Sequence, residues 1–290
     1  MSRFLNFKVL MTSTLCLVYG SLTAQNLSHP IVDSHSHIKT VSSDERYVTM
    51  EEYFVENKSL NIQYMFGVTI ARRGNVEETK TRNDSLFLMS KRDSRFIPVY
   101  SVHPGDGEEA IKELHRIKDI GGKIIKLHPL NQNFAILSNE MINVARLAGD
   151  LDLVILIDGY GFIFPNYLEL LLQLAMAMPK TKFIIAHMGG TDFYKLGGFN
   201  LVKTVNPELF NNVWYDLSAT VHIYADSPYK SQLEWVIRSI GVDRVLFGSD
   251  QPVVSLSEAL KSFNKLDFDD AERERILYKN TIELLGLPSK

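Results

Sequence analysis

Two histidines separated by a single residue, His35 and His37, are the first side chains of this chain that could do chemistry. They follow a short β-prone run at residues 31–32. Side chains on a strand alternate between its two faces, so both imidazoles point the same way, with Asp33 on the same face. Two imidazoles on one face can bind a divalent metal ion. A pair of exposed loop histidines is the alternative interpretation, and the motif alone leaves both open.

Other residues that bind metals or move protons stand at the ends of later β-prone runs. Lys126 and His128 end the fourth run, His187 the sixth and Asp250 the eighth. Each has a plainer interpretation by itself: His187 could be a hydrogen-bonded core histidine, and Asp250 could be a helix N-cap. Together they indicate a site if one fold brings these strand ends to the same place.

The elements that would position these residues alternate along the chain. Eight β-prone runs occur, at 31–32, 64–70, 96–102, 123–127, 153–157, 183–186, 213–217 and 245–247. Helical patterns separate or follow them, such as 108–118, 139–147, 167–177, 232–240 and 270–285. Strands that alternate with helices predict βαβ units and a parallel sheet. Eight units in roughly 250 residues is the size of one (β/α)₈ TIM barrel. A doubly wound open sheet is the competing α/β fold, but no Gly-x-Gly-x-x-Gly follows an early strand.

The spacing of the candidate residues agrees with a barrel. His35 and His187 are 152 residues apart, or about 30 for each of five βα units, and His187 and Asp250 are 63 apart, or about 31 for each of two. Active sites of TIM barrels lie at the C-terminal ends of the strands, where these residues fall. We therefore predict a single TIM-barrel domain over residues 25–290.

The composition excludes several classes of protein. Apolar residues make up 45% of the chain, and 31 basic against 34 acidic residues give a net charge of −3. A disordered chain would have fewer apolar residues, and a nucleic-acid binder usually has an excess of basic residues, so we expect neither. The single cysteine, Cys16, excludes a disulfide framework and a metal site built from several cysteines.

The first 24 residues are interpreted as a secretory signal peptide. Arg3 and Lys8 form a basic start, residues 9–19 are mostly apolar, and small residues lead to a predicted cleavage site after Ala24. The apolar run is too short for a stable membrane span, which needs ~20 apolar residues. Cleavage would leave 266 residues without Cys16 and, with 29 basic against 34 acidic residues, a net charge of −5. We therefore expect an exported protein, periplasmic or secreted. The alternatives to a cleaved secretory signal are a lipoprotein acylated at Cys16 and an uncleaved anchor or disordered tail.

The strand-end motifs resemble those of the metal-dependent amidohydrolase superfamily, in its amidohydrolase-related branch. That branch also contains enzymes similar to aminocarboxymuconate-semialdehyde decarboxylase. The matching pieces are DSHSH at 33–37, GKIIKLHP at 122–129, IIAHMGG at 184–190 and LFGSDQP at 246–252. The resemblance extends over nearly the whole chain after the predicted signal peptide.

The resemblance implies a role for each candidate on the first, sixth and eighth strands. His35, His37 and Asp250 would bind a divalent metal, and His187 would bind a metal or the substrate. The metal lowers the pKa of bound water towards ~7. Asp250 would accept the proton of that water and pass it to the leaving group.

The strand-four motif carries two further candidates. By the resemblance, Lys126 and His128 would position an anionic group of the substrate, or Lys126 would become a carbamate ligand of the metal. The alternative for Lys126 is a cation at the barrel rim paired with an acid. Arg72 and Arg73 follow the second run and could bind a substrate carboxylate, or they could be solvated loop residues.

The fifth strand departs from the family pattern. The family usually has a histidine where this chain has Asp158. Asp158 could bind the metal through oxygen or act directly in catalysis, it could hydrogen-bond another site residue, or it could mark a degenerate site.

Three functions remain open. The first is a metal-dependent hydrolase of a small-molecule amide, lactone or ester, using metal-activated water. The second is a metal-dependent decarboxylase of a small carboxylic acid. The third is a non-catalytic binding protein with a degenerate metal site. Zinc is the expected metal and manganese the alternative, because His and Asp ligands suit both. The expected partner is a small-molecule substrate, and a homo-oligomer is left open.

Overall fold

The computed structural model describes residues 29–42, 44–162 and 164–289, and only the backbone of residues 199, 200 and 203. The predicted signal peptide, its cleavage site after Ala24 and Cys16 lie outside these residues and stay predictions. None of the helices in the described ranges is long and apolar enough to cross a membrane.

The structure has eight strands, each at or near one of the predicted runs. They are β1 (Ile31–His37), β2 (Ile62–Val68), β3 (Phe96–Ser101), β4 (Ile124–Leu127), β5 (Val154–Ile157), β6 (Phe183–Ile185), β7 (Val213–Asp216) and β8 (Val245–Leu246). The α-helices are α2 (Met50–Glu56), α3 (Val76–Arg92), α4 (Glu108–Asp119), α5 (Pro129–Gln132), α6 (Asn139–Asp150), α7 (Tyr167–Ala177), α8 (Phe199–Val205), α9 (Thr220–Tyr224), α10 (Lys230–Ile240), α11 (Leu256–Phe263), α12 (Asp270–Glu274) and α13 (Asn280–Leu285). Shorter or irregular turns are η2 (Pro104–Asp106), η3 (Ala186–Gly198), η4 (Val242–Arg244) and the π-helical η5 (Arg275–Lys279).

All neighbouring strands pair in parallel, in the order of the sequence from β1 to β8. The ring closes between the last strand and the first. The Ser34 amide donates to the Phe247 carbonyl at 3.0 Å, the Asp250 amide to the His35 carbonyl at 2.7 Å, and the His37 amide to the Gln251 carbonyl at 2.8 Å. The predicted (β/α)₈ TIM barrel is therefore confirmed, and the doubly wound sheet, whose strand order would reverse, is excluded.

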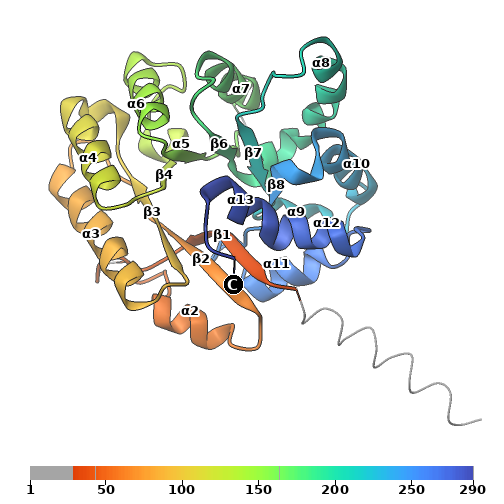
Figure 1. Cartoon of the computed structure of the whole chain (residues 1–290), viewed down its shortest axis with the longest axis horizontal. Helices are drawn as coiled ribbons and strands as arrows, with labels where there is room; N and C mark the ends of the chain where they lie inside the picture. The colour runs from red at the N-terminus through yellow and green to blue at the C-terminus, as the bar shows by residue number, and fades with distance from the viewer. Residues whose placement is uncertain (1–28, 43, 163, 290) are drawn as a thin grey trace, which may run out of the picture.

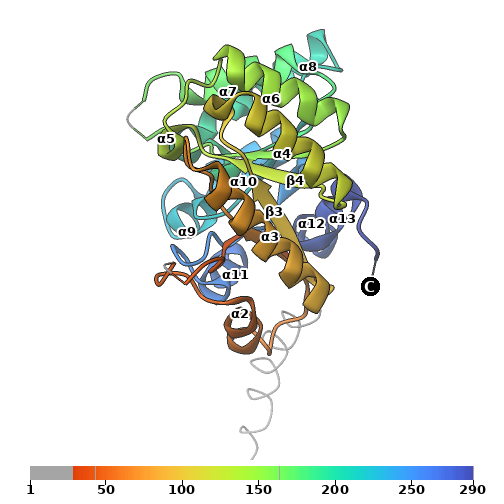
Figure 2. The same ribbon diagram turned by 90° about the vertical axis from the view of Figure 1, so that its left-hand side faces the viewer.

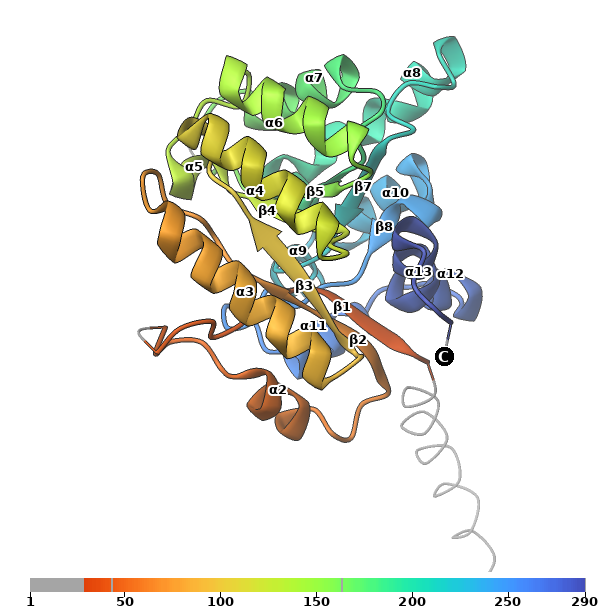
Figure 3. The same ribbon diagram turned by 60° about the vertical axis from the view of Figure 1, so that its left-hand side comes forward.

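The strands are buried because helices cover them from outside. β5 consists of four apolar residues, all buried, as expected for a parallel strand with both faces covered. Figure 1 shows α3, α4, α6 and α7 following one another around the strands, and Figure 3 shows α3 lying along β3. In α4, Ala110, Leu114 and Ile117 turn inwards at helical spacing.

The helix predicted at 270–285 is one helical stretch with a change of pitch in the middle. It begins as α12, continues as the π-helical η5 and ends as α13. The amide of Phe247 donates to the Ile276 carbonyl at 3.0 Å, and Asn280 Nδ2 donates to the carbonyls of Val242 and Val245 at 2.7 Å each. These bonds fasten the end of the chain to β8.

The two ends of the barrel are distinct. Helices α5 and α9 follow the C-terminal ends of β4 and β7, and they lie with α11 on the side opposite α13 and the chain's C-terminus (Figure 2). β4 reads Ile-Ile-Lys-Leu and is fully buried. Lys126 is therefore a charged side chain in an otherwise apolar strand. Lysine is almost never fully buried without a partner, which makes Lys126 a marker of function.

Candidate active site

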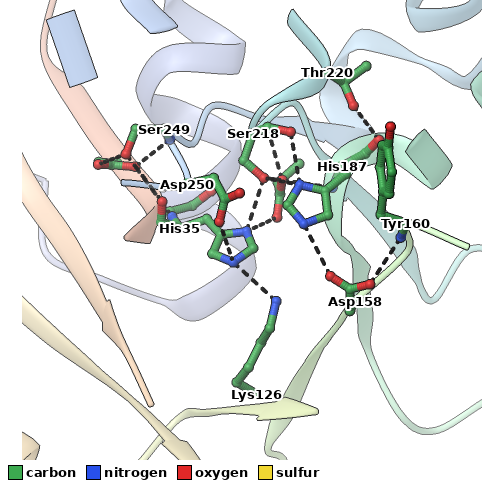
Figure 4. A network of polar contacts seen from close by, with 12 residues as sticks. His35, Lys126, Asp158, Tyr160, His187, Ser218, Thr220, Ser249 and Asp250 are labelled. Carbon is green, nitrogen blue, oxygen red and sulfur yellow. Dashed lines mark hydrogen bonds and ion pairs between the residues drawn. The ribbon is translucent and has the colours of Figure 1, made fainter. Parts of the chain in front are cut away.

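The structure brings the predicted site residues together at the C-terminal end of the barrel (Figure 4). Five of them are buried, namely His35, Lys126, Asp158, His187 and Asp250. His37 and His128 are partly exposed, with 16% and 20% of their side-chain surface accessible, so the site opens to solvent on their side. The roles assigned to these residues remain predictions.

The two histidines of β1 face the same carboxylate oxygen. Asp250 Oδ1 lies 3.6 Å from His35 Nε2 and 3.4 Å from His37 Nε2. Asp250 has a positive φ of 67°, and its amide is bonded to the His35 carbonyl across the closing seam of the barrel. Burial alone would raise the pKa of Asp250, but the hydrogen bond with His37 and the neighbouring histidines lower it. Asp250 is therefore an ionised carboxylate placed between two imidazoles.

Asp216, at the end of β7, orients His35 and was not singled out from the sequence. Its Oδ2 lies 3.1 Å from His35 Nδ1, and its Oδ1 accepts from the backbone amides of His187 at 3.1 Å and Ser218 at 3.0 Å. The Ser218 hydroxyl donates to the same carboxylate. With a proton on Nδ1 facing Asp216, the lone pair of His35 is on Nε2, which faces the centre of the site. The rule of strand ends that found the other residues would have found Asp216 as well.

A third buried carboxylate, Asp33, lies under the site, and no cationic side chain pairs with it among the described residues. Ser249 donates to it through its amide at 2.8 Å and its hydroxyl at 2.7 Å, and the Tyr53 hydroxyl of α2 donates at 2.8 Å. Burial raises the pKa of Asp33 to about 6, against the effect of these donors. Because Ser249 precedes Asp250, the Asp33 carboxylate holds the segment that carries Asp250.

Gly248 explains how β8 comes so close to β1. A Cβ atom at this position would lie 3.0 Å from the Cβ of His35 and 3.4 Å from the Cβ of Ser218. The contact with His35 would be tighter than nine in ten real Cβ contacts, whereas the one with Ser218 would be an ordinary van der Waals contact. The glycine therefore allows the seam to close beside His35.

His187 has a partner at each ring nitrogen. Nδ1 lies 3.0 Å from the Ser218 carbonyl, which can only accept, and Nε2 lies 3.2 Å from Asp158 Oδ2. The pKa of His187 rises to about 9, because the hydrogen bond and charge of Asp158 outweigh the opposite effect of burial. The pKa of Asp158 is correspondingly held well below its usual range, although burial opposes this too. The two residues form an imidazolium–carboxylate pair.

The strand-four residues complete the cluster. Lys126 Nζ lies 3.1 Å from His35 Nε2, and burial lowers its pKa while Asp158, Asp216 and Asp250 oppose the change. His128 Nε2 lies 3.5 Å from Asp158 Oδ2, and burial lowers the pKa of His128 to about 4. His128 also accepts from the Asn131 amide at 3.3 Å as the N-cap of α5. Asp158 therefore faces two histidines, which makes it the centre of this half of the site.

The donor set fits a divalent metal ion. His35, His187 and Asp250 each offer a ligand atom, and these atoms all lie within 4.8 Å of one another. Imidazole and carboxylate donors suit zinc and manganese, and three protein ligands leave a coordination position open, as catalytic sites do. Lys126 lies against Nε2 of His35, which is the nitrogen that would bind the metal. His187 could bind the metal through Nε2 only if this nitrogen released Asp158.

Of the other histidines, His103 has a structural environment. Its Nδ1 accepts from the Gly105 amide at 3.0 Å, and its Nε2 lies 2.5 Å from the Gln132 carbonyl. It caps η2 and ties the loop after β3 to α5. Both ring nitrogens are occupied by backbone groups, so His103 does not contribute to the cluster.

Comparison with known proteins agrees with the fold. The family model described as Amidohydrolase matches residues 32–287, so the chain belongs to the amidohydrolase family, an enzyme family, as the strand-end motifs predicted. No curated protein matches the chain.

Three solved structures illustrate the likeness, which at these identities concerns the fold. A 2,6-dihydroxybenzoate decarboxylase from Rhizobium is 18% identical, with 89% of this chain and 98% of that chain covered and a TM-score of 0.68. A 5-carboxyvanillate decarboxylase from Novosphingobium aromaticivorans, complexed with manganese and a nitrobenzoic acid, is 14% identical, with 89% and 96% covered and a TM-score of 0.68. A probable 2-pyrone-4,6-dicarboxylic acid hydrolase from Acinetobacter baumannii, with citric acid bound, is 18% identical, with 88% and 99% covered and a TM-score of 0.65.

Proposed function

We propose that this protein is a metal-dependent hydrolase of a small-molecule amide, lactone or ester. The observation that carries the proposal is the convergence of two β1 imidazoles on the ionised carboxylate of Asp250 at the open end of the barrel. We assign the metal to His35, His37 and Asp250. We assign His187 to the substrate side, because acceptors at both its ring nitrogens hold it in the protonated form, which has no lone pair for a metal.

When bound, a divalent ion would supply Lewis acidity, which polarises a carbonyl and lowers the pKa of water. Asp250, which is ionised, accepts a proton from the attacking water and delivers it to the leaving group. His187, which is protonated and held between Asp158 and the Ser218 carbonyl, places positive charge on the side of the substrate oxygen on which negative charge develops. Lys126 adds positive charge on the same side. Asp216 keeps the His35 ring in the tautomer that presents Nε2.

Metal analysis of the purified protein tests the proposal first. We expect about one zinc or manganese ion per chain and a higher thermal midpoint after the metal is added, because binding to the native state stabilises it. His35→Ala should abolish both effects, and His115→Ala, on the exposed side of α4, should change neither. Full metal content in the His35 variant would refute the ligand assignment.

Decarboxylation of a small carboxylic acid is the second candidate. The observation that favours it is that two of the three solved structures above are decarboxylases of aromatic acids. A panel of lactones, amides, esters and aromatic acids, assayed both for acid release and for carbon dioxide, separates the two reactions. Carbon dioxide release without hydrolysis would replace our first proposal by the second. A protein without metal binding and without turnover would instead be the non-catalytic binding protein.

We also propose that the protein is exported to the periplasm or secreted, on the strength of the sequence of residues 1–24 alone. Fractionation of cells that express the full chain, with mass measurement of the mature N-terminus, tests this. A mature protein that begins after Ala24 in the exported fraction is the expected result. An intact N-terminus on cytoplasmic protein would contradict it.

A further inference from the structure

A cavity of about 280 Å³ lies beside His37, on the solvent side of the candidate metal ligands. The loop between β1 and α2, the loop between β2 and α3, the helix α3 and the short helix α5 form its walls. The ionisable side chains that line it are His37, Asp44, Arg46, Tyr47, Arg72 and Arg82. Its size suits one functional group of a small molecule and the few atoms attached to that group.

The charges in this wall do not cancel. Of the three arginines, Arg82 is paired with Asp44 at 2.6 Å and with Glu78 at 2.9 Å, so the only acidic residue of the lining is already neutralised. Arg82 also donates to the Thr40 hydroxyl, and its bonds to Thr40 and Asp44 fix the loop after β1 against α3. Arg46 and Arg72 are exposed and have no carboxylate partner among the residues that the structure describes. Two guanidinium groups are therefore left to face the cavity.

His37 belongs both to the lining of the cavity and to the candidate site. The Arg46 guanidinium lies over the Tyr47 ring, 4.7 Å from its centroid, and the Tyr47 ring stacks on His37 with 5.8 Å between the centroids. His37 Nε2 is 3.4 Å from Asp250 Oδ1. A molecule that reacts at Asp250 would therefore extend past His37 into the arginine-lined cavity.

We propose that Arg72 and Arg46 bind a carboxylate of the substrate that is distinct from the group that reacts. The inference rests on the proposed function, because it names the far end of the same small molecule. A guanidinium forms two parallel hydrogen bonds with a carboxylate, and such charge-assisted pairs are stronger than neutral ones. The substrate class is a small organic acid that carries its hydrolysable bond a few atoms away from this carboxylate.

The neighbouring arginine provides a matched control. Arg73 is exposed like Arg72, but its Nε lies against Gly105 and the residue does not line the cavity. Replacing either arginine removes the same charge from adjacent positions of one loop. Only the loss of Arg72 should affect an anion bound beside His37.

The probe is benzene-1,3-dicarboxylate, titrated by calorimetry into the purified full chain, with and without added zinc. We expect Arg72→Met to weaken binding about tenfold or more, Arg46→Met to weaken it less, and the double variant to weaken it most. Arg72→Lys should restore part of the affinity, because it keeps the charge but not the two parallel bonds. Arg73→Met should leave the affinity within about twofold of wild type.

The proposal would be overturned by no binding of the dicarboxylate, by equal binding by the double variant, or by equal weakening by Arg73→Met. Inorganic phosphate is titrated in parallel, and binding of phosphate that depends on Arg72 without binding of the dicarboxylate would also overturn it. Because the titration needs no turnover, its outcome is independent of the proposed reaction. Arginine-dependent binding by a protein that hydrolyses nothing would refute the proposed function alone.

Discussion

The two halves of the candidate site are built differently. On the β1–β8 side, backbone bonds of the barrel seam hold His35, His37 and Asp250, Ser249 and Tyr53 hold the underlying Asp33, and Asp216 orients His35. On the β4–β6 side, Asp158 and His187 hold each other through opposite charges, with Lys126 and His128 close by. The first half therefore suits a metal ion, whereas the second half is a group of charges that suits contact with a substrate. Substitutions in each half test whether metal binding and substrate contact are divided in this way.

Asp250→Asn should have the largest effect. The amide keeps the shape of the side chain but cannot accept a proton, and a general base typically contributes 10²–10⁴-fold to the rate. We expect kcat to fall by about 10²–10⁴, measured on the first substrate that the panel identifies. A fall in KM alone, or an unchanged kcat, would show that Asp250 is not the base.

Asp158→Asn should have a smaller effect and separate the two halves. Because Asp158 holds His187 and is not assigned to the metal, we expect kcat to fall about 10–100-fold while the metal content stays at the wild-type value. Elemental analysis of the same preparation is the deciding measurement. Loss of metal in this variant would mean that the β4–β6 side also carries ligands and that the division is wrong.

Lys126→Met should tighten metal binding about tenfold. The Lys126 amine lies 3.1 Å from His35 Nε2, and an ammonium at that distance repels a divalent ion. The dissociation constant of zinc, measured by competition with a chelator, tests this. Weaker binding by the methionine variant would support the alternative in which Lys126 is itself a ligand, as a carbamate.

Tyr53→Phe should have the smallest effect on the site, because it lowers stability and leaves the metal in place. It removes one hydroxyl that donates to the buried Asp33, and the lost hydrogen bond to a charged group is worth about 1.5–3 kcal/mol of stability, with Ser249 still in place. Denaturant unfolding of the metal-free protein measures the loss. We expect the metal stoichiometry to stay unchanged. A loss of metal would show that the metal site between β1 and β8 depends on the contact from α2 as well as on the backbone bonds of the seam.

The fold and most of the site could be predicted from the sequence because both follow from local patterns. Each strand is a short apolar run, and a barrel collects the residues that follow such runs at one end. His35, His187 and Asp250 were found in this way. Asp216 stood in an equivalent position, but an aspartate after a strand is common, and only the contact with His35 Nδ1 distinguishes it.

Other contributions depend on contacts that no local pattern reveals. Tyr53 reaches Asp33 from a different helix, and Ser218 lies between two histidines only because β6 and β7 are neighbours. The departure at Asp158 could be seen in the sequence, but its partner could not. Asp158 Oδ2 lies 3.2 Å from His187 Nε2, and a histidine in place of Asp158 could not form this ion pair.

The seam between β8 and β1 also has a consequence for how the protein matures. Asp33 and Ser249 are in direct contact although 216 positions separate them along the chain. A ribosome must therefore finish nearly the whole polypeptide before His35 can meet Asp250, and loop closure over such a length is among the slowest kinds of contact to form. Metal binding at these residues would therefore occur late. Only chains whose barrel has closed would bind the ion, and shorter nascent chains would not.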